Sequence, residues 1–308
     1  MSALPRLVVV LGPTASGKST LGIRLAEKLG GEILVCDSTQ VYRHFDIGTA
    51  KVPAAEQRGI AHHLLDLCEP AEIFTAGDYR RRALEALDDL RARKISPILT
   101  AGTGLYLRAL LEGLADAPQR SEEIRARLRK RAEQRGLEHL HRALARLDPE
   151  SAARISARDT QKIIRAIELR LLTGKPMGEI HRSGRDALQG YEIIKIGLLP
   201  PRAALYARIH ARTAAMLATG WLEEVRALVA SGVPANAKPF QFIGYSQLRE
   251  HLAGRLSEAD AVQQIQQATR HFAKRQLTWF RKEPGVHWLP GFGDAPEVFA
   301  AALAILKS

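Results

Sequence analysis

The chain has 308 residues, of which 46% are hydrophobic, and this is enough to bury a sizeable core in one large domain or two smaller ones. It has no apolar run near the roughly 20 residues that cross a bilayer, no secretory pattern at its N-terminus and only two cysteines, so we expect a cytoplasmic, monomeric protein without membrane contact. The formal net charge of +12 is uneven, because residues 1–117 are neutral, residues 118–190 carry +7 and the remainder carries +5. A separate basic surface indicates a polyanionic partner, with nucleic acid as the first candidate and general solubility as the alternative.

Strands and helices alternate in the first third of the chain. Strands are predicted at 6–11, 32–36 and 97–100, and helices at 19–29, 78–94 and 105–114. Such alternation is typical of a parallel sheet covered by helices on both faces.

The pattern then becomes helical. Residues 118–190 contain almost no strand signal and predict charged helices at 121–134, 137–147 and 160–172. A strand returns at 191–199, and helices follow at 203–217, 222–230 and 258–282. We therefore expect an α/β fold with a P-loop-type parallel sheet, formed by residues 1–117 and 191–308, and an all-helical, basic insertion at 118–190.

A phosphate-binding loop lies between the first strand and the first helix. The sequence "GPTASGKS" has the spacing G-x-x-x-x-G-K-S, with Gly12, Gly17, Lys18 and Ser19. Its backbone N–H groups and the helix N-terminus would bind an anion, Lys18 would add a positive charge, and the Ser19 hydroxyl could join a magnesium shell. The residues expected to bind a diphosphate here are Gly12, Thr14, Ala15, Ser16, Gly17, Lys18, Ser19 and Thr20.

The loop does not decide the chemistry. An ATPase or GTPase usually has an apolar strand that ends in a magnesium-binding Asp, but the strand at 97–100 is followed by "AGTG". Asp66 could serve, although its strand pattern is poorer. Asp37 directly follows the strand after the loop helix, so it could face an acceptor near the phosphates or be only a turn residue.

Seven stretches together resemble the bacterial tRNA dimethylallyltransferase (isopentenyltransferase) family. They are "GPTASGKS" (12–19), "DSTQVYR" (37–43), "DIGTAK" (46–51), "HHLLD" (62–66), "AGTGLY" (101–106), "FIGYSQ" (242–247) and "KRQLTWFR" (274–281). "DIGTAK" and "KRQLTWFR" in this order are the most specific. At Thr39 the family pattern has a hydrophobic residue or Ala, and this change leaves Asp37 and Gln40 in place.

The resemblance implies a reaction. Dimethylallyl diphosphate would donate its five-carbon group to N6 of the adenine 3′-adjacent to the anticodon in tRNA, with magnesium as cofactor and diphosphate as leaving group. It implies Asp37 as general base, Lys18 and the loop as stabilisers of the leaving group, and Thr103 near the reacting phosphate oxygens or as a helix N-cap. It also implies that Arg212 reaches the diphosphate, although Arg212 could equally face solvent.

The remaining expected residues concern the tRNA anticodon stem-loop. An enzyme that acts on one base must take that base out of its stack, so a basic surface and base-contacting side chains are needed. Trp279 and Phe280 could alternatively belong to the core, and the run "RARLRKR" (125–131) could be only a solvated helix face. Residues expected to contact tRNA are Asp37, Ser38, Thr39, Gln40, Thr103, Arg125, Gln161, Lys162, Arg165, Gln241, Phe242, Gly244, Tyr245, Ser246, Lys274, Arg275, Gln276, Trp279 and Arg281.

Two other functions use some of the same features. A P-loop kinase of a small metabolite would use the loop and Asp37, but it leaves the basic insertion unexplained. An RNA-binding module, with or without NTPase activity, would explain the charge but not the acid beside the loop.

Overall fold

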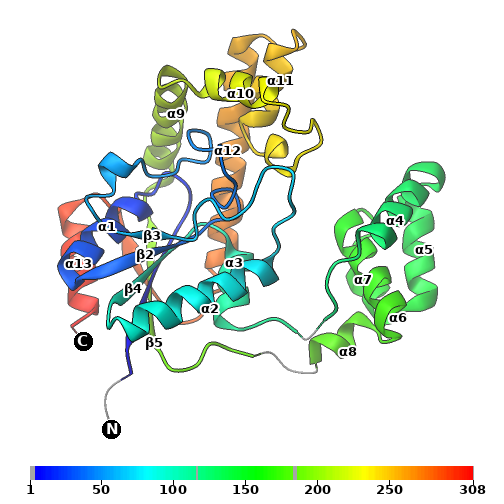
Figure 1. The fold of residues 1–308 in the computed structure, drawn as a ribbon, viewed down its shortest axis with the longest axis horizontal. Helices are drawn as coiled ribbons and strands as arrows, with labels where there is room; N and C mark the ends of the chain where they lie inside the picture. The colour runs from blue at the N-terminus through cyan, green and yellow to red at the C-terminus, as the bar shows by residue number, and fades with distance from the viewer. Residues whose placement is uncertain (1–3, 116, 183–185, 308) are drawn as a thin grey trace. The chain divides into compact units, whose positions relative to one another are not determined.

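The computed structural model describes residues 4–115, 117–182 and 186–307 (Figure 1). The chain forms two compact units. Unit 1 contains the chain up to Leu110 and from Gln189 onward, and unit 2 is the segment Leu111–Leu188. None of the described helices is long and apolar enough to cross a membrane.

Unit 1 is built on one parallel sheet. Its neighbouring strands follow the order β3-β2-β4-β1-β5-β6, and all pairings between these described strands are parallel. This confirms the expected fold class. The strands are β1 (Arg6–Leu11), β2 (Gly31–Cys36), β3 (His62–His63), β4 (Ser96–Ala101), β5 (Glu192–Leu199) and β6 (Val286–Pro290). The sequence did not predict β3 and β6, because the first is two residues long and the second has no clear alternation.

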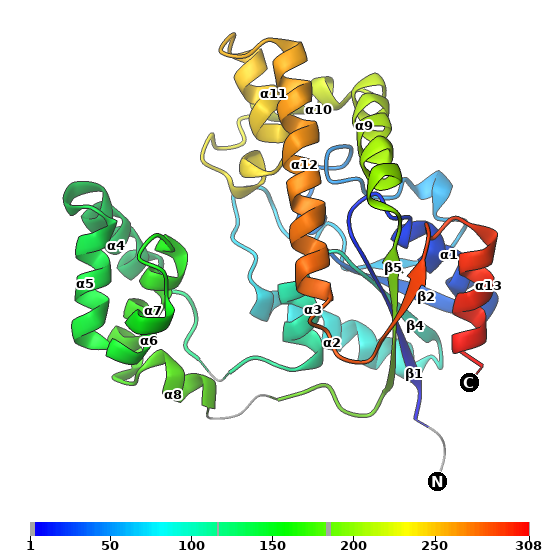
Figure 2. The same ribbon diagram turned by 180° about the vertical axis from the view of Figure 1, so that it is seen from behind.

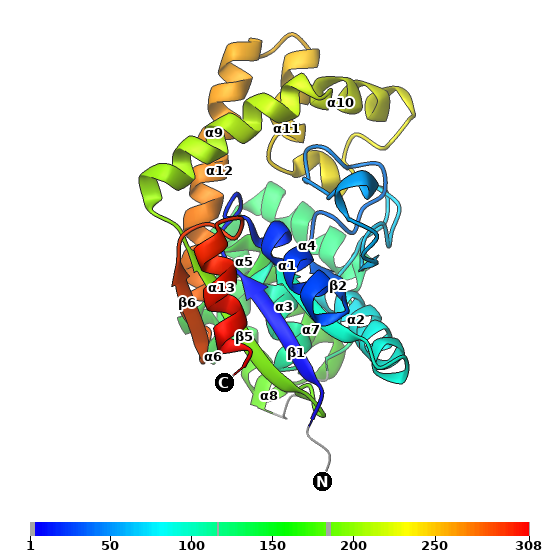
Figure 3. The same ribbon diagram turned by 90° about the vertical axis from the view of Figure 1, so that its left-hand side faces the viewer.

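Helices cover the sheet and extend beyond it. Helices α1 and α13 lie on one face of the sheet (Figure 3), where their apolar side chains pack on strand residues such as Val10 and Ile196. The long α12 runs beside α9, and α10 and α11 lie at its first half (Figure 2). The helices of unit 1 are α1 (Lys18–Leu29), α2 (Ala76–Ala92), α3 (Gly104–Leu111), α9 (Arg202–Ala218), α10 (Trp221–Ala230), α11 (Tyr245–Leu252), α12 (Glu258–Phe280) and α13 (Pro296–Ile305), with 3₁₀ turns at Ala54–Glu56 and Lys238–Gln241.

Glycine lets α1 approach the sheet closely. A Cβ at Gly22 would lie 2.6 Å from Cγ2 of Thr100 on β4, so a larger residue would push the helix away. Gly17, just before the helix, has φ 85°, and Gly30, just after it, has φ 61°. Both values lie in the left-handed region, so these glycines fix where α1 begins and ends.

The regular elements described in unit 2 are all helices. Side chains including Leu128, Leu140, Leu144 and Ile163 form its apolar core. The Leu188 N–H donates to the Leu111 carbonyl at 3.0 Å, which joins the two ends of the unit. The helices are α4 (Glu122–Arg135), α5 (Leu137–Leu147), α6 (Pro149–Arg154), α7 (Thr160–Thr173) and α8 (Met177–Arg182).

A buried ion pair lies in the core of unit 2. Glu168 is fully buried and accepts hydrogen bonds from Nε and Nη2 of Arg125 at 2.9 and 2.8 Å. It also accepts from Nη1 of Arg165 and from the Ser121 N–H, both at 2.7 Å. The side chain of Arg125 is only 9% exposed. The sequence placed Arg125 on an RNA-facing surface, and the structure instead places its guanidinium in the core, because Glu168 needs a buried counter-charge.

Candidate active site

The ends of three neighbouring strands meet at one edge of the sheet. Ala101 of β4 pairs in register with Leu11 of β1 on one side and with Cys36 of β2 on the other. The segments that follow these strands are therefore adjacent: the loop 12–17 after β1, Asp37 after β2, and Gly102 with Thr103 after β4. Residues far apart in the sequence are thus brought together, as parallel sheets do at their carboxyl ends.

The phosphate-binding loop has the backbone shape of an anion site. Ala15 and Gly17 have φ values of 62° and 85°, and a turn closes between the Pro13 carbonyl and the Ser16 N–H. The Gly293 N–H donates to the Ser16 carbonyl at 2.9 Å and fixes the loop from the C-terminal segment. Ser19 and Thr20 are exposed in the first turn of α1.

Two cations lie beside this loop. Lys18 Nζ donates to the Pro13 carbonyl at 2.8 Å, and Arg212 Nη1 of α9 donates to Oγ1 of Thr14 at 3.4 Å. Burial lowers the pKa of Lys18 to about 8, while Asp37 raises it and Arg212 lowers it further. Burial also lowers the pKa of Arg212. Arg212 therefore faces the loop and is not a solvated surface residue.

The carboxylate of Asp37 is held in place through one of its two oxygens. Its Oδ1 accepts the Thr39 N–H at 2.8 Å and the Thr39 hydroxyl at 2.7 Å, so the turn expected from the sequence is present. Its Oδ2 lies 2.5 Å from the place where a Cβ at Gly102 would be. Only glycine at 102 leaves room for this oxygen. The carboxylate is oriented through Oδ1 while Oδ2 points towards the turn after β4.

Thr103 joins the ends of β2 and β4. Its Oγ1 accepts the Ser38 N–H at 2.9 Å and donates to the Ser38 hydroxyl at 3.2 Å. The Gly102 and Thr103 N–H groups both donate to the Cys36 carbonyl at 3.0 Å. The Thr103 carbonyl accepts the Leu107 N–H at the start of α3, but its hydroxyl is used towards Ser38 and not as a helix cap.

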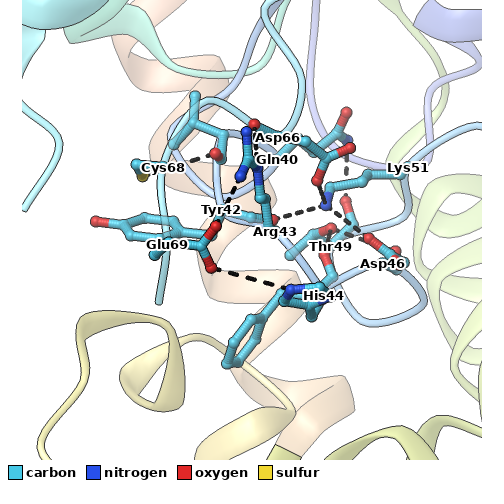
Figure 4. A network of polar contacts seen from close by, with 12 residues as sticks. Gln40, Tyr42, Arg43, His44, Asp46, Thr49, Lys51, Asp66, Cys68 and Glu69 are labelled. Atoms are coloured by element: carbon cyan, nitrogen blue, oxygen red, sulfur yellow. Dashed lines mark hydrogen bonds and ion pairs between the residues drawn. The ribbon is translucent and has the colours of Figure 1, made fainter. Parts of the chain in front are cut away.

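A buried lysine organises the segment after Asp37 (Figure 4). Lys51 Nζ donates to the Tyr42 carbonyl and to Oδ1 of Asp46, both at 2.6 Å, and to Oδ1 of Asp66 at 2.5 Å. Gln40 Nε2 donates to the Thr49 carbonyl at 2.9 Å and, at 3.3 Å, to the neighbouring carbonyl of residue 50. Asp66, a candidate magnesium ligand in the sequence, therefore binds the lysine of "DIGTAK".

Helices α10 and α11 hold the same segment from its other side. Oε2 of Glu224 accepts the N–H groups of residues 46 and 47 at 3.1 and 2.8 Å. The Tyr245 hydroxyl accepts the Gly48 N–H at 3.1 Å and donates to Oε1 of Glu224 at 2.5 Å. The Trp221 indole lies against Gly48 and Gly244, where a Cβ would be 2.2 and 1.9 Å from its ring atoms. "DIGTAK" and "FIGYSQ" are therefore in direct contact.

The segment "QFIGYSQ", which includes five of the expected tRNA contacts, is largely helical. A 3₁₀ turn ends at Gln241 and α11 begins at Tyr245, which is fully buried. Gly244 is also buried, whereas Gln241 is exposed and Phe242 and Ser246 are half-buried. The expectation that Tyr245 contacts tRNA was wrong, because its ring fills the space between α10, α11 and the "DIGTAK" segment.

The residues expected to contact RNA at the C-terminal end of α12 differ in their exposure to solvent. Lys274, Arg275 and Arg281 are exposed, and Phe280 is buried as the core alternative predicted. Trp279 is 37% exposed, contacts Gly104, and lies 4.9 Å below the Arg108 guanidinium. Gln276 is only 6% exposed and turns inward.

The residues of unit 2 that were expected to contact RNA also differ in their exposure to solvent. Gln161 and Lys162 are exposed at the start of α7. Arg165 is partly buried, since it donates to Glu168 and, at 3.1 Å, to the Pro118 carbonyl.

Comparisons with known proteins agree with this arrangement. A family model described as IPP transferase matches residues 40–283. The chain belongs to this family. It is 52% identical to the tRNA dimethylallyltransferase of Solibacter usitatus, over 96% of this chain and 96% of that one. It is 50% identical to the tRNA dimethylallyltransferase of Koribacter versatilis, over 99% of this chain and 99% of that one.

Solved structures show the same IPP transferase fold. The full-length tRNA isopentenylpyrophosphate transferase of Bacillus halodurans is 33% identical, with a TM-score of 0.71 over 98% of this chain and 97% of that one. A eukaryotic dimethylallyltransferase acting on tRNA is 26% identical, with a TM-score of 0.83 over 98% of this chain and 78% of that one.

Some residues of this IPP transferase site were not singled out in the sequence. Lys51 and Glu224 position the "DIGTAK" segment, and Trp221 packs between the two motif glycines. The only sequence signal for Lys51 was its place in "DIGTAK". The sequence held no signal for Glu224 or Trp221, because their partners are distant in the sequence.

Proposed function

We propose that the protein transfers the dimethylallyl group of dimethylallyl diphosphate to N6 of the adenine that is 3′-adjacent to the anticodon in tRNA, releasing diphosphate. One observation carries this: the loop with Lys18 and Arg212 lies close to the carboxylate of Asp37, at one edge of the sheet. An anion site next to a carboxylate base suits an alkyl transfer from a diphosphate to an amine. The names of the closely similar relatives support the same reaction.

The donor side acts on the leaving group. The loop N–H groups, Lys18 and Arg212 bind the diphosphate and stabilise the negative charge that grows on it as the C–O bond breaks. Thr14, held by Arg212, and Thr103 lie at the edge of this region. Ser19 offers an exposed hydroxyl at the start of α1, which would suit a magnesium ion. Bound there, Mg²⁺ would neutralise part of the charge on the departing diphosphate.

The acceptor side acts on the adenine. The N6 amine is a poor nucleophile and must lose a proton as its bond to the allyl carbon forms. Oδ2 of Asp37 accepts that proton, and the two bonds from Thr39 to Oδ1 keep the carboxylate in place. Ser38 lies next to Asp37 on the turn and suits a contact to the base edge, whereas Nε2 of Gln40 holds the carbonyls of residues 49 and 50.

A direct test supplies labelled dimethylallyl diphosphate and unmodified tRNA without ATP, followed by nucleoside analysis. The proposal expects label on one adenosine and release of diphosphate. A requirement for ATP with a phosphorylated small acceptor would indicate a kinase. A tRNA shift in a gel without diphosphate release would indicate a binding module.

The pKa of Lys18 predicts a pH dependence. A lysine normally keeps its charge up to about pH 10, but Lys18, with a pKa of about 8, loses it earlier in the free protein. We expect kcat/KM for dimethylallyl diphosphate to fall as the pH rises through about 8, since this ratio reports groups of the free enzyme. Lys18→Arg, which stays charged, should retain some activity and lose this decrease. The same decrease in Lys18→Arg would exclude Lys18 as its source.

The proposed RNA surface consists of exposed residues on each unit. In unit 1 these are Gln241, Lys274, Arg275, Trp279 and Arg281, and in unit 2 they are Gln161 and Lys162. Such contacts to phosphates position the RNA, while the turn at Asp37 selects the base.

Salt dependence tests the contact in unit 2. The side chain of Lys162 is 70% exposed and pairs with Asp159 only at the surface, so it can turn to a phosphate at little cost. We expect Lys162→Ala to weaken tRNA binding and to reduce the slope of log K against log salt by about 0.7. Lys175→Ala is a matched control, since Lys175 is also exposed in unit 2 and pairs with Glu179. A slope for Lys162→Ala equal to that of the wild-type protein would place Lys162 away from the RNA.

A further inference from the structure

Gln276 links the two halves of the active site through one amide group. Its Oε1 accepts the Thr14 N–H at 2.7 Å, and its Nε2 donates to the Gly102 carbonyl at 2.8 Å. The side chain enters from α12 and is 6% exposed. Thr14 belongs to the phosphate-binding loop, and Gly102 is the residue against which Oδ2 of Asp37 lies.

The amide is matched to both of its partners. One partner is a donor and the other an acceptor, and the planar carboxamide of glutamine offers one acceptor and one donor side by side. An apolar side chain would satisfy neither backbone group, and an ionised carboxylate could not donate to the Gly102 carbonyl. Buried polar groups left unpaired are costly, so a change here would shift the two segments.

The position of this bridge bears directly on the transfer. The loop holds the leaving group of the electrophile, and the turn at Gly102 borders the base that receives the proton. Their separation decides whether the allyl carbon and the N6 nitrogen meet in line. A misplacement of about 1 Å can lower a rate by about 10²-fold.

We infer that Gln276 is a positioning residue, which fixes the distance between the diphosphate-binding loop and the general base, and that it does not bind tRNA. This inference rests on the proposed function. It replaces the expectation that Gln276 contacts RNA like its exposed neighbours Lys274 and Arg275, because the amide is buried and both its oxygen and its nitrogen are hydrogen-bonded within the protein.

Gln276→Leu tests the inference kinetically. We expect kcat for dimethylallyl transfer to fall about 10- to 100-fold, with the Kd for tRNA within about twofold of wild type, since no RNA contact is removed. Gln264→Leu is the control, because it makes the same substitution on an exposed face of α12. An unchanged kcat, or a weakened tRNA Kd with normal kcat at saturation, would overturn the inference.

Gln276→Glu separates positioning from a general loss of structure. A protonated glutamic acid can donate to the Gly102 carbonyl and accept from Thr14, whereas the ionised form would repel that carbonyl and Asp37. The ratio of wild-type to variant kcat should therefore shrink as the pH falls, and the ratio for Gln276→Leu should stay constant. Asp37, Lys18 and Arg212 are charged groups near this site in every variant, and Gln276→Leu, which adds no charge, shows how the ratio behaves when only the bridge is lost. Parallel ratios for the two variants would contradict the inference.

A measurement without substrate separates this inference from the proposed reaction. Hydrogen exchange at the Thr14 amide should speed up in Gln276→Leu but not in Gln264→Leu, whatever the enzyme transfers. Unchanged exchange would remove the bridge as a constraint on the loop. Absence of transfer in the wild-type protein would instead refute the proposed function.

Discussion

Asp37→Asn is expected to lower kcat for dimethylallyl transfer by about 10²–10⁴-fold, the usual contribution of a positioned general base. Asparagine has the same shape and its oxygen can still accept both bonds from Thr39. It cannot take up the proton that N6 must lose. The turn should therefore keep its geometry, and tRNA binding should be nearly unchanged.

Single-turnover rates with saturating enzyme measure this effect without a contribution from product release. Asp88→Asn is the matched control, because Asp88 lies on the surface of α2, where it pairs with Arg91. A fully active Asp37→Asn enzyme would mean that another group, or water, accepts the proton.

Glu168→Leu is expected to destabilise unit 2 by about 3–5 kcal/mol, the usual cost of leaving a buried charge without its partner. The side chain accepts four hydrogen bonds, and its removal leaves the guanidinium of Arg125 in the core without a counter-charge. The loss should reach both helices that share the pair, α4 and α7.

Hydrogen exchange of the α4 and α7 amides, together with the thermal midpoint of the full chain, measures this loss. Glu179→Leu removes an exposed pair with Lys175 in the same unit and should cost about 0–1 kcal/mol. Similar losses in the two variants would show that the buried pair contributes no more than an exposed one.

Local patterns in the sequence predicted most of the fold. The first strand and loop, the helices from α4 to α7 except the short α6, and the return to strand at β5 were all placed within a few residues. These segments have clear apolar periodicity and recognisable ends, such as Asp159, whose side chain caps α7. Elements without such signals were missed: β3, β6 and α13, which form only because the sheet and α1 provide a surface for them.

The sequence predicted which residues gather at the candidate site more accurately than it predicted which residues are exposed to solvent. Lys18, Asp37, Thr103 and Arg212 do lie near one another, because each is fixed by a strand end or faces the loop. Arg125, Tyr245 and Gln276 carry side chains that suit RNA, yet all three are buried. Periodicity places a residue on a helix face, but only the packing of distant segments decides whether that face meets solvent.

The joined ends of unit 2 make it an exchangeable part of the molecule. Because Leu111 and Leu188 are hydrogen-bonded to each other, the chain leaves the catalytic core and returns to it at nearly the same point. A segment inserted in this way can lengthen, shrink or diverge without moving the strands on either side of it. Evolution could therefore change this unit while the chemistry of the sheet edge stays constant, and an engineer could graft another helical module at the same two residues.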